Sequence, residues 1–179
     1  MTHGDTIRLT APAKVNLSLN IIGRRDDGYH LLDSIVVFTA FGDQIDLSPA
    51  SGDSVRVSGP FAASLTAAGD NICLRALSAF REAGGEAGPL AIHIDKQIPV
   101  GAGLSGGSSD AAAMLRHLNG ASAHPLSEEQ LAAVALSLGA DVPVCLAGTA
   151  QRMQGIGEIL TPLEPPPRGH LVLARPDAM

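Results

Sequence analysis

Residues 99–110 have the residue types and the spacing needed to bind a phosphate chain. They read Pro-Val-Gly-Ala-Gly-Leu-Ser-Gly-Gly-Ser-Ser-Asp, follow a strand-like run and open a helix-like run. Glycines let a backbone approach a bulky anion, and a helix start offers unpaired N–H groups and the positive end of its dipole. Serine hydroxyls can bond phosphate oxygens or ligate Mg²⁺. The stretch predicts a nucleotide-phosphate site whose candidate residues are Pro99, Gly101, Ala102, Gly103, Leu104, Ser105, Gly106, Gly107, Ser108 and Ser109.

Two common nucleotide motifs fit this loop less well. Gly101, Gly103 and Gly106 satisfy G-x-G-x-x-G, but a dinucleotide-binding fold needs a second strand with an acidic tip about 20 residues later. Residues 121–125, Ala-Ser-Ala-His-Pro, are instead typical of a loop. The glycines also mimic the start of a P-loop, but Gly107 stands where that motif has its lysine. A glycine-rich turn without a ligand is the simpler alternative, although a turn alone needs fewer glycines and serines.

The composition limits the classes of protein to which the chain can belong. Its 179 residues, 45% of them hydrophobic, suffice for one domain and the start of another, and 3% aromatic residues imply an aliphatic core. A net charge of −6 argues against broad binding to nucleic acid but not against a nucleotide. Cys73 and Cys145 lie far apart and are expected to be reduced. Without a signal-like start or a long apolar run, we expect a cytoplasmic protein that does not bind a membrane.

The elements that must position the loop follow from hydrophobic periodicity. Strands come first in the chain, and strands mixed with helices follow, which indicates an α+β fold with a mixed sheet packed against helices. An exposed turn is expected over residues 23–28. Alternating or continuous apolar residues predict strands over 7–11, 15–21, 35–41, 45–47, 55–57, 90–94, 150–153, 158–160 and 171–174.

Three helices are expected around the loop. The first begins at residue 70 or 71 and ends near residue 83, before two glycines. The second follows the loop, and apolar residues spaced i, i+3, i+4 and i+7 over 111–118 form its buried face. The third begins with a capping box of Ser127 and Gln130 and ends at Gly139.

Four segments, taken in order, resemble the GHMP kinases. Besides residues 99–113, they are Ala-Pro-Ala-Lys-Val-Asn-Leu at 11–17, Arg-Asp-Asp-Gly-Tyr-His at 25–30 and Leu-Gly-Ala-Asp-Val-Pro at 138–143. The resemblance runs over nearly the whole chain and implies the N-terminal domain of that family, which is similar to a ribosomal-protein fold. Residues 1–162 are then the ATP-binding domain. Residues 163–179 are a linker and the first strand of an absent or truncated C-terminal domain.

The resemblance also implies a reaction and its cofactors, ATP and Mg²⁺. The γ-phosphoryl group of ATP moves to a hydroxyl of a small-molecule substrate, a cytidine-diphosphate-linked sugar alcohol of isoprenoid-precursor synthesis. Asp141 matches the catalytic base, and Lys14 matches the lysine beside it. From the residues alone, an Asp141 that only caps or turns the chain and a solvated Lys14 on the polar face of a strand are the simpler alternatives.

Substrate and metal residues are implied in the same way. Asn16 orients the substrate hydroxyl or Asp141, Tyr29 stacks on the pyrimidine, and His30 faces the edge of the base. The alternative for Tyr29 is a surface turn with a packed ring. Ser108 is the candidate for a hydroxyl near Mg²⁺, whereas Asp110 is expected to serve the first turn of the helix after the loop.

One residue of the loop departs from the family pattern. Ser105 stands where the family usually has glycine, and its side chain would narrow the phosphate loop or demand a particular φ.

Two other functions are alternatives to the kinase. A catalytically incomplete nucleotide-binding or assembly module is the first alternative. An RNA-binding module is the second, but the pI of about 5.4 weighs against it. We expect no nucleic-acid partner, and a monomer or weak homodimer.

Overall fold

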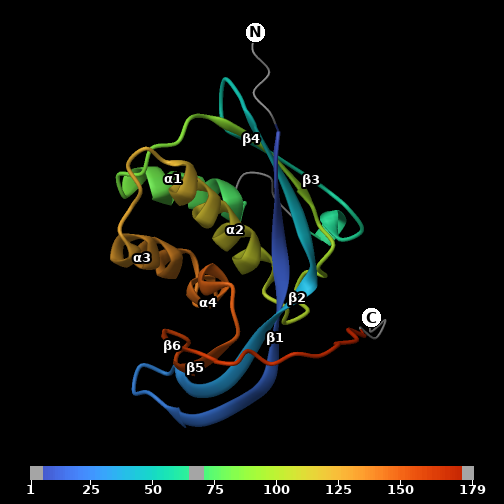
Figure 1. Cartoon of the computed structure of the whole chain (residues 1–179), viewed down its shortest axis with the longest axis vertical. Coiled ribbons are helices and arrows are strands. Elements are labelled where there is room, and N and C mark those ends of the chain that lie inside the picture. Colours follow the sequence, from blue (N-terminus) through green and yellow to red (C-terminus); the bar gives the residue numbers. More distant parts are fainter. Residues whose placement is uncertain (1–5, 65–70, 175–179) are drawn as a thin grey trace.

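Two long antiparallel strands form the centre of the fold (Figure 1). The computed structural model describes residues 6–64 and 71–174, and in it β1 (Ile7–Arg24) pairs with β2 (His30–Pro49) over nearly their whole lengths. The sequence predicted two shorter strands in place of each. That prediction was wrong for two reasons. In β2, Gly42 and Asp43 do not end the strand but pair with Pro12 and Ala11 of β1. In β1, the pairing with β2 continues across three shifts of register, so the strand is irregular but not interrupted.

Within residues 6–64 and 71–174, four shorter strands complete a mixed six-stranded sheet. β4 (Leu90–Asp95) pairs with residues 44–49 of β2, and β5 (Gln151–Gly155) pairs with residues 32–36. β3 (Ser54–Ser58) runs parallel to β4, and β6 (Ile159–Pro162) runs antiparallel to β5. This parallel pair among the described strands makes the sheet mixed, as the sequence predicted.

In the described part of the chain, four α-helices lie on one side of the sheet (Figure 1), and a short 3-10 helix spans Ala62–Ser64. They are α1 (Ile72–Glu82), α2 (Gly106–Ala121), α3 (Glu128–Leu138) and α4 (Val142–Ala147). α2 is the central one, because it contacts the other three helices and β1. Phe80 is the only fully buried aromatic side chain among the described residues, so the core is aliphatic, as the composition predicted.

The helix starts follow local capping signals. The side chain of Asn71 accepts a hydrogen bond of 2.9 Å from the Cys73 amide, and Ser127 with Gln130 forms both bonds of the predicted capping box. Residue 70, the other candidate start for α1, lies outside the described residues. α4 was not predicted from the sequence. Pro143 is compatible with it because proline is tolerated in the first turn of a helix.

The predicted strand over residues 171–174 is not formed. An apolar run becomes a strand only where a neighbouring strand accepts its backbone hydrogen bonds, and no described strand pairs with this one. The segment instead lines hollows beside Phe38 and Phe41 of β2. The proposed division between residues 162 and 163 stays a prediction. Both cysteines, Cys73 and Cys145, are buried free thiols, as expected.

Candidate active site

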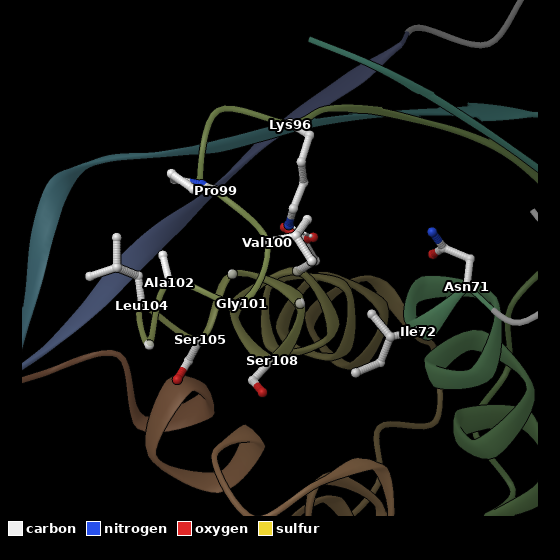
Figure 2. Close-up of a pocket in the computed structure, with 14 residues that line it drawn as sticks. Asn71, Ile72, Lys96, Pro99, Val100, Gly101, Ala102, Leu104, Ser105 and Ser108 are labelled. Carbon is white, nitrogen blue, oxygen red and sulfur yellow. Dashed lines mark hydrogen bonds and ion pairs between the residues drawn. The ribbon is translucent and has the colours of Figure 1, made fainter. Parts of the chain in front are cut away.

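The glycine-rich loop between β4 and α2 lines a pocket of about 570 Å³ (Figure 2). Nine of the ten residues that the sequence singled out for phosphate binding line it, from Pro99 to Ser108, together with Ile72 of α1 and Asn71, which caps that helix. Ser109 is the exception. It is 1% exposed, and its hydroxyl donates to the backbone oxygen of Pro12, so it joins α2 to β1 rather than facing the pocket.

The loop presents its backbone to the pocket. Gly101 and Gly103 have φ values of 74° and 73°, in the left-handed region that glycine adopts at little cost. A Cβ atom at Gly106 would lie 3.1 Å from the Lys96 ammonium, so the first turn of α2 also needs glycine for close packing. The first N–H groups of a helix have no partner within the helix. The loop and the start of α2 together are therefore suited to an anion.

Lys14 of β1 and Asp141 meet beside this loop, although 127 residues separate them. The Lys14 Nζ and Asp141 Oδ1 atoms are 2.9 Å apart. The Lys14 side chain is 4% exposed, which makes the solvated-strand alternative wrong, and the Asp141 side chain is 39% exposed. One oxygen of a partly accessible carboxylate is thereby held by a buried cation.

Asp141 occupies the N-cap position of α4, yet its carboxylate makes no hydrogen bond to that helix. The capping alternative for this side chain is therefore wrong. Its second oxygen, Oδ2, accepts a hydrogen bond from the Ser105 hydroxyl. The backbone N–H of Lys14 donates to Leu104 O at 3.1 Å, so loop, β1 and the start of α4 form one connected unit.

A buried charged cluster lies under the pocket. Lys96 Nζ lies 2.6 Å from both Asp43 Oδ2 and Asp110 Oδ2, and Asp43 Oδ1 accepts the backbone N–H groups of Gln97 and Ile98. The prediction that Asp110 serves the first turn of the helix was wrong. The helix begins at Gly106, so Asp110 lies one turn later and faces Lys96.

Burial and ion pairing oppose each other in this cluster. Burial raises the pKa of Asp110 to about 7, against the attraction of Lys96. Burial alone would lower the pKa of Lys96, but attraction to Asp110 and Asp43 exceeds that effect and raises it. Two carboxylates thus share one lysine, and Lys96 contributes little net positive charge to the pocket that it lines. Asp110 Oδ1 has no hydrogen-bond partner among the described residues.

The sequence did not identify Lys96 or Asp43 as parts of the site. Their types offered a signal, because Asp43 interrupts the apolar residues of a central strand and Lys96 stands between a strand and the loop. Their pairing spans 53 positions, and no local pattern shows it.

The three candidate substrate residues lie elsewhere on the β1–β2 hairpin. Asn16 follows Lys14 by two positions on β1, and its amide donates to Ser34 Oγ at 2.6 Å. Tyr29 lies in the turn that joins the strands and is 60% exposed, and His30 begins β2. None of them lines the phosphate pocket, so their roles stay predictions.

Comparison with known proteins shows which fold this architecture resembles. Residues 71–149, from the start of α1 through α4, match the GHMP kinases N terminal domain. This match and the crystal structure described below bear out the fold that the sequence predicted, the N-terminal α+β fold of GHMP kinases with a mixed sheet. No helix among the described residues is both long and apolar enough to cross a membrane.

Three similar proteins carry names of the same kinase. The 4-diphosphocytidyl-2-C-methyl-D-erythritol kinase of Paramagnetospirillum magneticum is 51% identical over 168 residues, which are 94% of this chain and 59% of that protein. The kinase of the same name from Brucella abortus is 51% identical over 88% of this chain and 54% of its own length. A crystal structure of 4-(cytidine 5'-diphospho)-2C-methyl-D-erythritol kinase matches with a TM-score of 0.72 and 39% identity, over 88% of this chain and 55% of that one. The chain spans a little over half the length of these relatives.

Proposed function

We propose that the protein containing this chain phosphorylates a hydroxyl of 4-diphosphocytidyl-2-C-methyl-D-erythritol with ATP, in isoprenoid-precursor synthesis. The observation that carries the proposal is the Lys14–Asp141 ion pair beside a glycine-rich loop at the start of α2. The pair supplies a carboxylate and a cation, and the loop supplies amide groups for a phosphate chain. Identity of about 50% to kinases of that name supports the choice of substrate.

The chemistry follows from what each group can do. The substrate hydroxyl oxygen attacks the γ-phosphorus of ATP, the bond from that phosphorus to the bridging oxygen breaks, and ADP leaves. Asp141 accepts the proton of the hydroxyl. Lys14 keeps Asp141 oriented and stabilises negative charge on the transferring group. Positioning and charge stabilisation supply most of the catalysis in such a transfer.

Mg²⁺ would add positive charge at the phosphates, and the residues present fit it. Mg²⁺ in proteins often keeps water and phosphate oxygens as ligands and takes only one or two groups from the chain. The described residues hold no cluster of three His, Cys, Asp or Glu suited to a metal. The Ser108 hydroxyl lines the pocket and is the side chain that we propose for the ion. The phosphates then bind to the backbone from Gly101 to Gly107.

The proposed substrate contacts lie on the β1–β2 hairpin. Tyr29 offers an exposed ring on which a cytosine can stack, and His30 follows it at the start of β2. Asn16 lies between this turn and Lys14 along β1, where it can orient the substrate hydroxyl. The hairpin would thus hold the cytidine diphosphate while the loop holds ATP.

The second candidate function is a nucleotide-binding module without catalysis, because the loop pocket can bind phosphates without a catalytic base. Such a module would bind ATP through the loop but would not transfer its γ-phosphoryl group. Nothing comparable favours the RNA-binding alternative.

The test compares the 179-residue chain with the complete protein that contains it. Formation of ADP and of phosphorylated substrate is followed with ATP, Mg²⁺ and 4-diphosphocytidyl-2-C-methyl-D-erythritol. Asp141→Asn should lower kcat by about 10³-fold and leave ATP binding intact, because it removes the base but not the loop. Glu129→Gln, an exposed carboxylate on α3, is the matched control. An Asp141→Asn enzyme with wild-type kcat would refute the role of Asp141, and ATP binding without turnover in both proteins would favour the module.

A further inference from the structure

Ser105 has a backbone conformation that suits glycine. Its φ of 51° and ψ of 36° lie in the left-handed region, which costs a residue with a Cβ atom free energy. It is the one residue other than glycine with a positive φ in the part of the chain that the structure describes. A serine held in this conformation indicates an interaction that compensates for the cost.

The compensating interaction is made by the Ser105 hydroxyl. A serine at an N-cap usually accepts a hydrogen bond from the first turn of its helix, but Ser105 makes no such bond to α2. Its hydroxyl instead donates to Asp141 Oδ2. In Figure 2 this hydroxyl points out of the loop, away from Lys96. The side chain is therefore used to hold a carboxylate rather than to cap a helix.

This contact closes a ring of three contacts around the candidate base. Lys14 Nζ holds Asp141 Oδ1 at 2.9 Å, Ser105 holds Asp141 Oδ2, and the Lys14 backbone N–H holds Leu104 O, one residue before Ser105. The conformation of the loop and the orientation of the carboxylate are thereby linked. A loop that moved would withdraw one of the two donors from Asp141.

We propose that Ser105 is a positioning residue that orients the Asp141 carboxylate when the loop has its phosphate-binding conformation. The step that depends on it is phosphoryl transfer, whereas ATP binding depends on the loop backbone. This inference rests on the proposed function of Asp141. A carboxylate that is 39% exposed can rotate unless both oxygens are held, and a misplaced catalytic group costs rate steeply. Glycine at this position would supply the backbone conformation but no donor.

Two variants separate the hydroxyl from the backbone. Ser105→Ala removes the hydroxyl and keeps the cost of the left-handed φ, while Ser105→Gly removes both. We expect both variants of the complete protein to lower kcat by about 10-fold or more, because a hydrogen bond to a charged group is lost. The KM for ATP should stay within about twofold, since the loop amides remain. Ser78→Ala, on an exposed turn of α1, is the matched control.

A second readout needs no substrate. The ¹³C NMR signal of the Asp141 carboxyl carbon, assigned by its loss in Asp141→Asn, reports whether the hydroxyl holds that group. It should shift in both Ser105 variants and not in Ser78→Ala. A wild-type kcat in Ser105→Gly, or a carbon signal that moves in neither variant, overturns the proposal and leaves the proposed function standing. A wild-type enzyme without turnover refutes the proposed function, and the carbon signal then decides alone whether Ser105 holds Asp141.

Discussion

Lys14 and Lys96 are two equally buried lysines whose partners differ. Each side chain is 4% exposed, but Asp141 beside Lys14 is 39% exposed, whereas Asp43 and Asp110 beside Lys96 are 0% and 4% exposed. A carboxylate that loses its cation can be rehydrated only if water reaches it. The two lysines should therefore matter for different properties of the molecule.

The substitutions Lys14→Met and Lys96→Met test this difference. We expect Lys96→Met to lower the free energy of unfolding by about 3 kcal/mol or more, because two buried carboxylates lose their cation. Lys14→Met should cost about 1 kcal/mol or less, because water reaches Asp141. Urea unfolding followed by circular dichroism measures both values. Equal losses in the two variants would contradict the argument.

The two thiols give a second prediction at this scale. Burial raises the pKa of the Cys145 thiol to about 11 and that of the Cys73 thiol well above its ordinary value. Because the reactive form is the thiolate, both groups should be almost inert toward Ellman's reagent at pH 8 in the native protein. Both should react at once in urea, since unfolding restores their ordinary pKa. Rapid reaction of either thiol in the folded protein would contradict this expectation.

At the scale of elements, the close approach of β1 and β2 depends on Gly42. A Cβ atom there would lie 2.2 Å from Ala11 O and 2.7 Å from Pro12 Cα, both backbone atoms that cannot rotate away. Gly42→Ala should therefore force the strands apart and lower the free energy of unfolding by about 3 kcal/mol. Because Asp43 directly follows Gly42, the buried cluster of Asp43, Lys96 and Asp110 should be displaced together with this part of β2.

Gly52 provides the matched control for that variant. It lies in the bend between β2 and β3, and nothing lies within 4 Å of a Cβ atom built there. Gly52→Ala should change the stability by less than about 1 kcal/mol. Chemical denaturation of the two variants in parallel measures the difference, and a Gly42→Ala protein as stable as Gly52→Ala would show that the strands adapt.

The sequence predicted the elements whose signals are local. Asn71 and Ser127 start helices within three residues of their partners, and the glycines of the loop carry its conformation themselves. The strand predicted over residues 171–174 is not formed, because a strand needs a pairing partner that composition does not reveal. The helix α4 was missed, because its formation depends on packing rather than on composition. The sequence therefore predicted the class of fold better than the number and length of its elements.

The residues of the candidate site also differ in whether local sequence signals could identify them. The loop could be recognised from its residues, and the family resemblance pointed to Lys14 and Asp141 as a pair. The burial of Lys14 and the partnership of Lys96 with Asp43 and Asp110 could not be predicted, because each joins segments far apart in the chain. Long-range ion pairs leave no periodic pattern in a sequence, so only the folded structure reveals them.

At the scale of the whole molecule, the candidate site depends on the global fold. Lys14 comes from β1, Ser105 from the loop and Asp141 from the start of α4, and α2 packs against β1 and α4 between them. No single element contains two of the three side chains. The site should therefore form and disappear with the core around α2 rather than as a separate unit.

Unfolding of the 179-residue chain in urea tests this dependence. Far-UV circular dichroism and the release of a fluorescent ATP analogue should give one common midpoint, because the loop keeps its conformation only while α2 is packed. In the presence of Mg²⁺, ATP at a concentration of 100 times the Kd for ATP should raise the free energy of unfolding by about 2.7 kcal/mol. Adenosine at the same concentration should raise it far less, since the loop is suited to phosphates. Release of the analogue at a clearly lower urea concentration than the loss of helix would show that the pocket opens while the core stays folded, and would place the loop outside the cooperative unit.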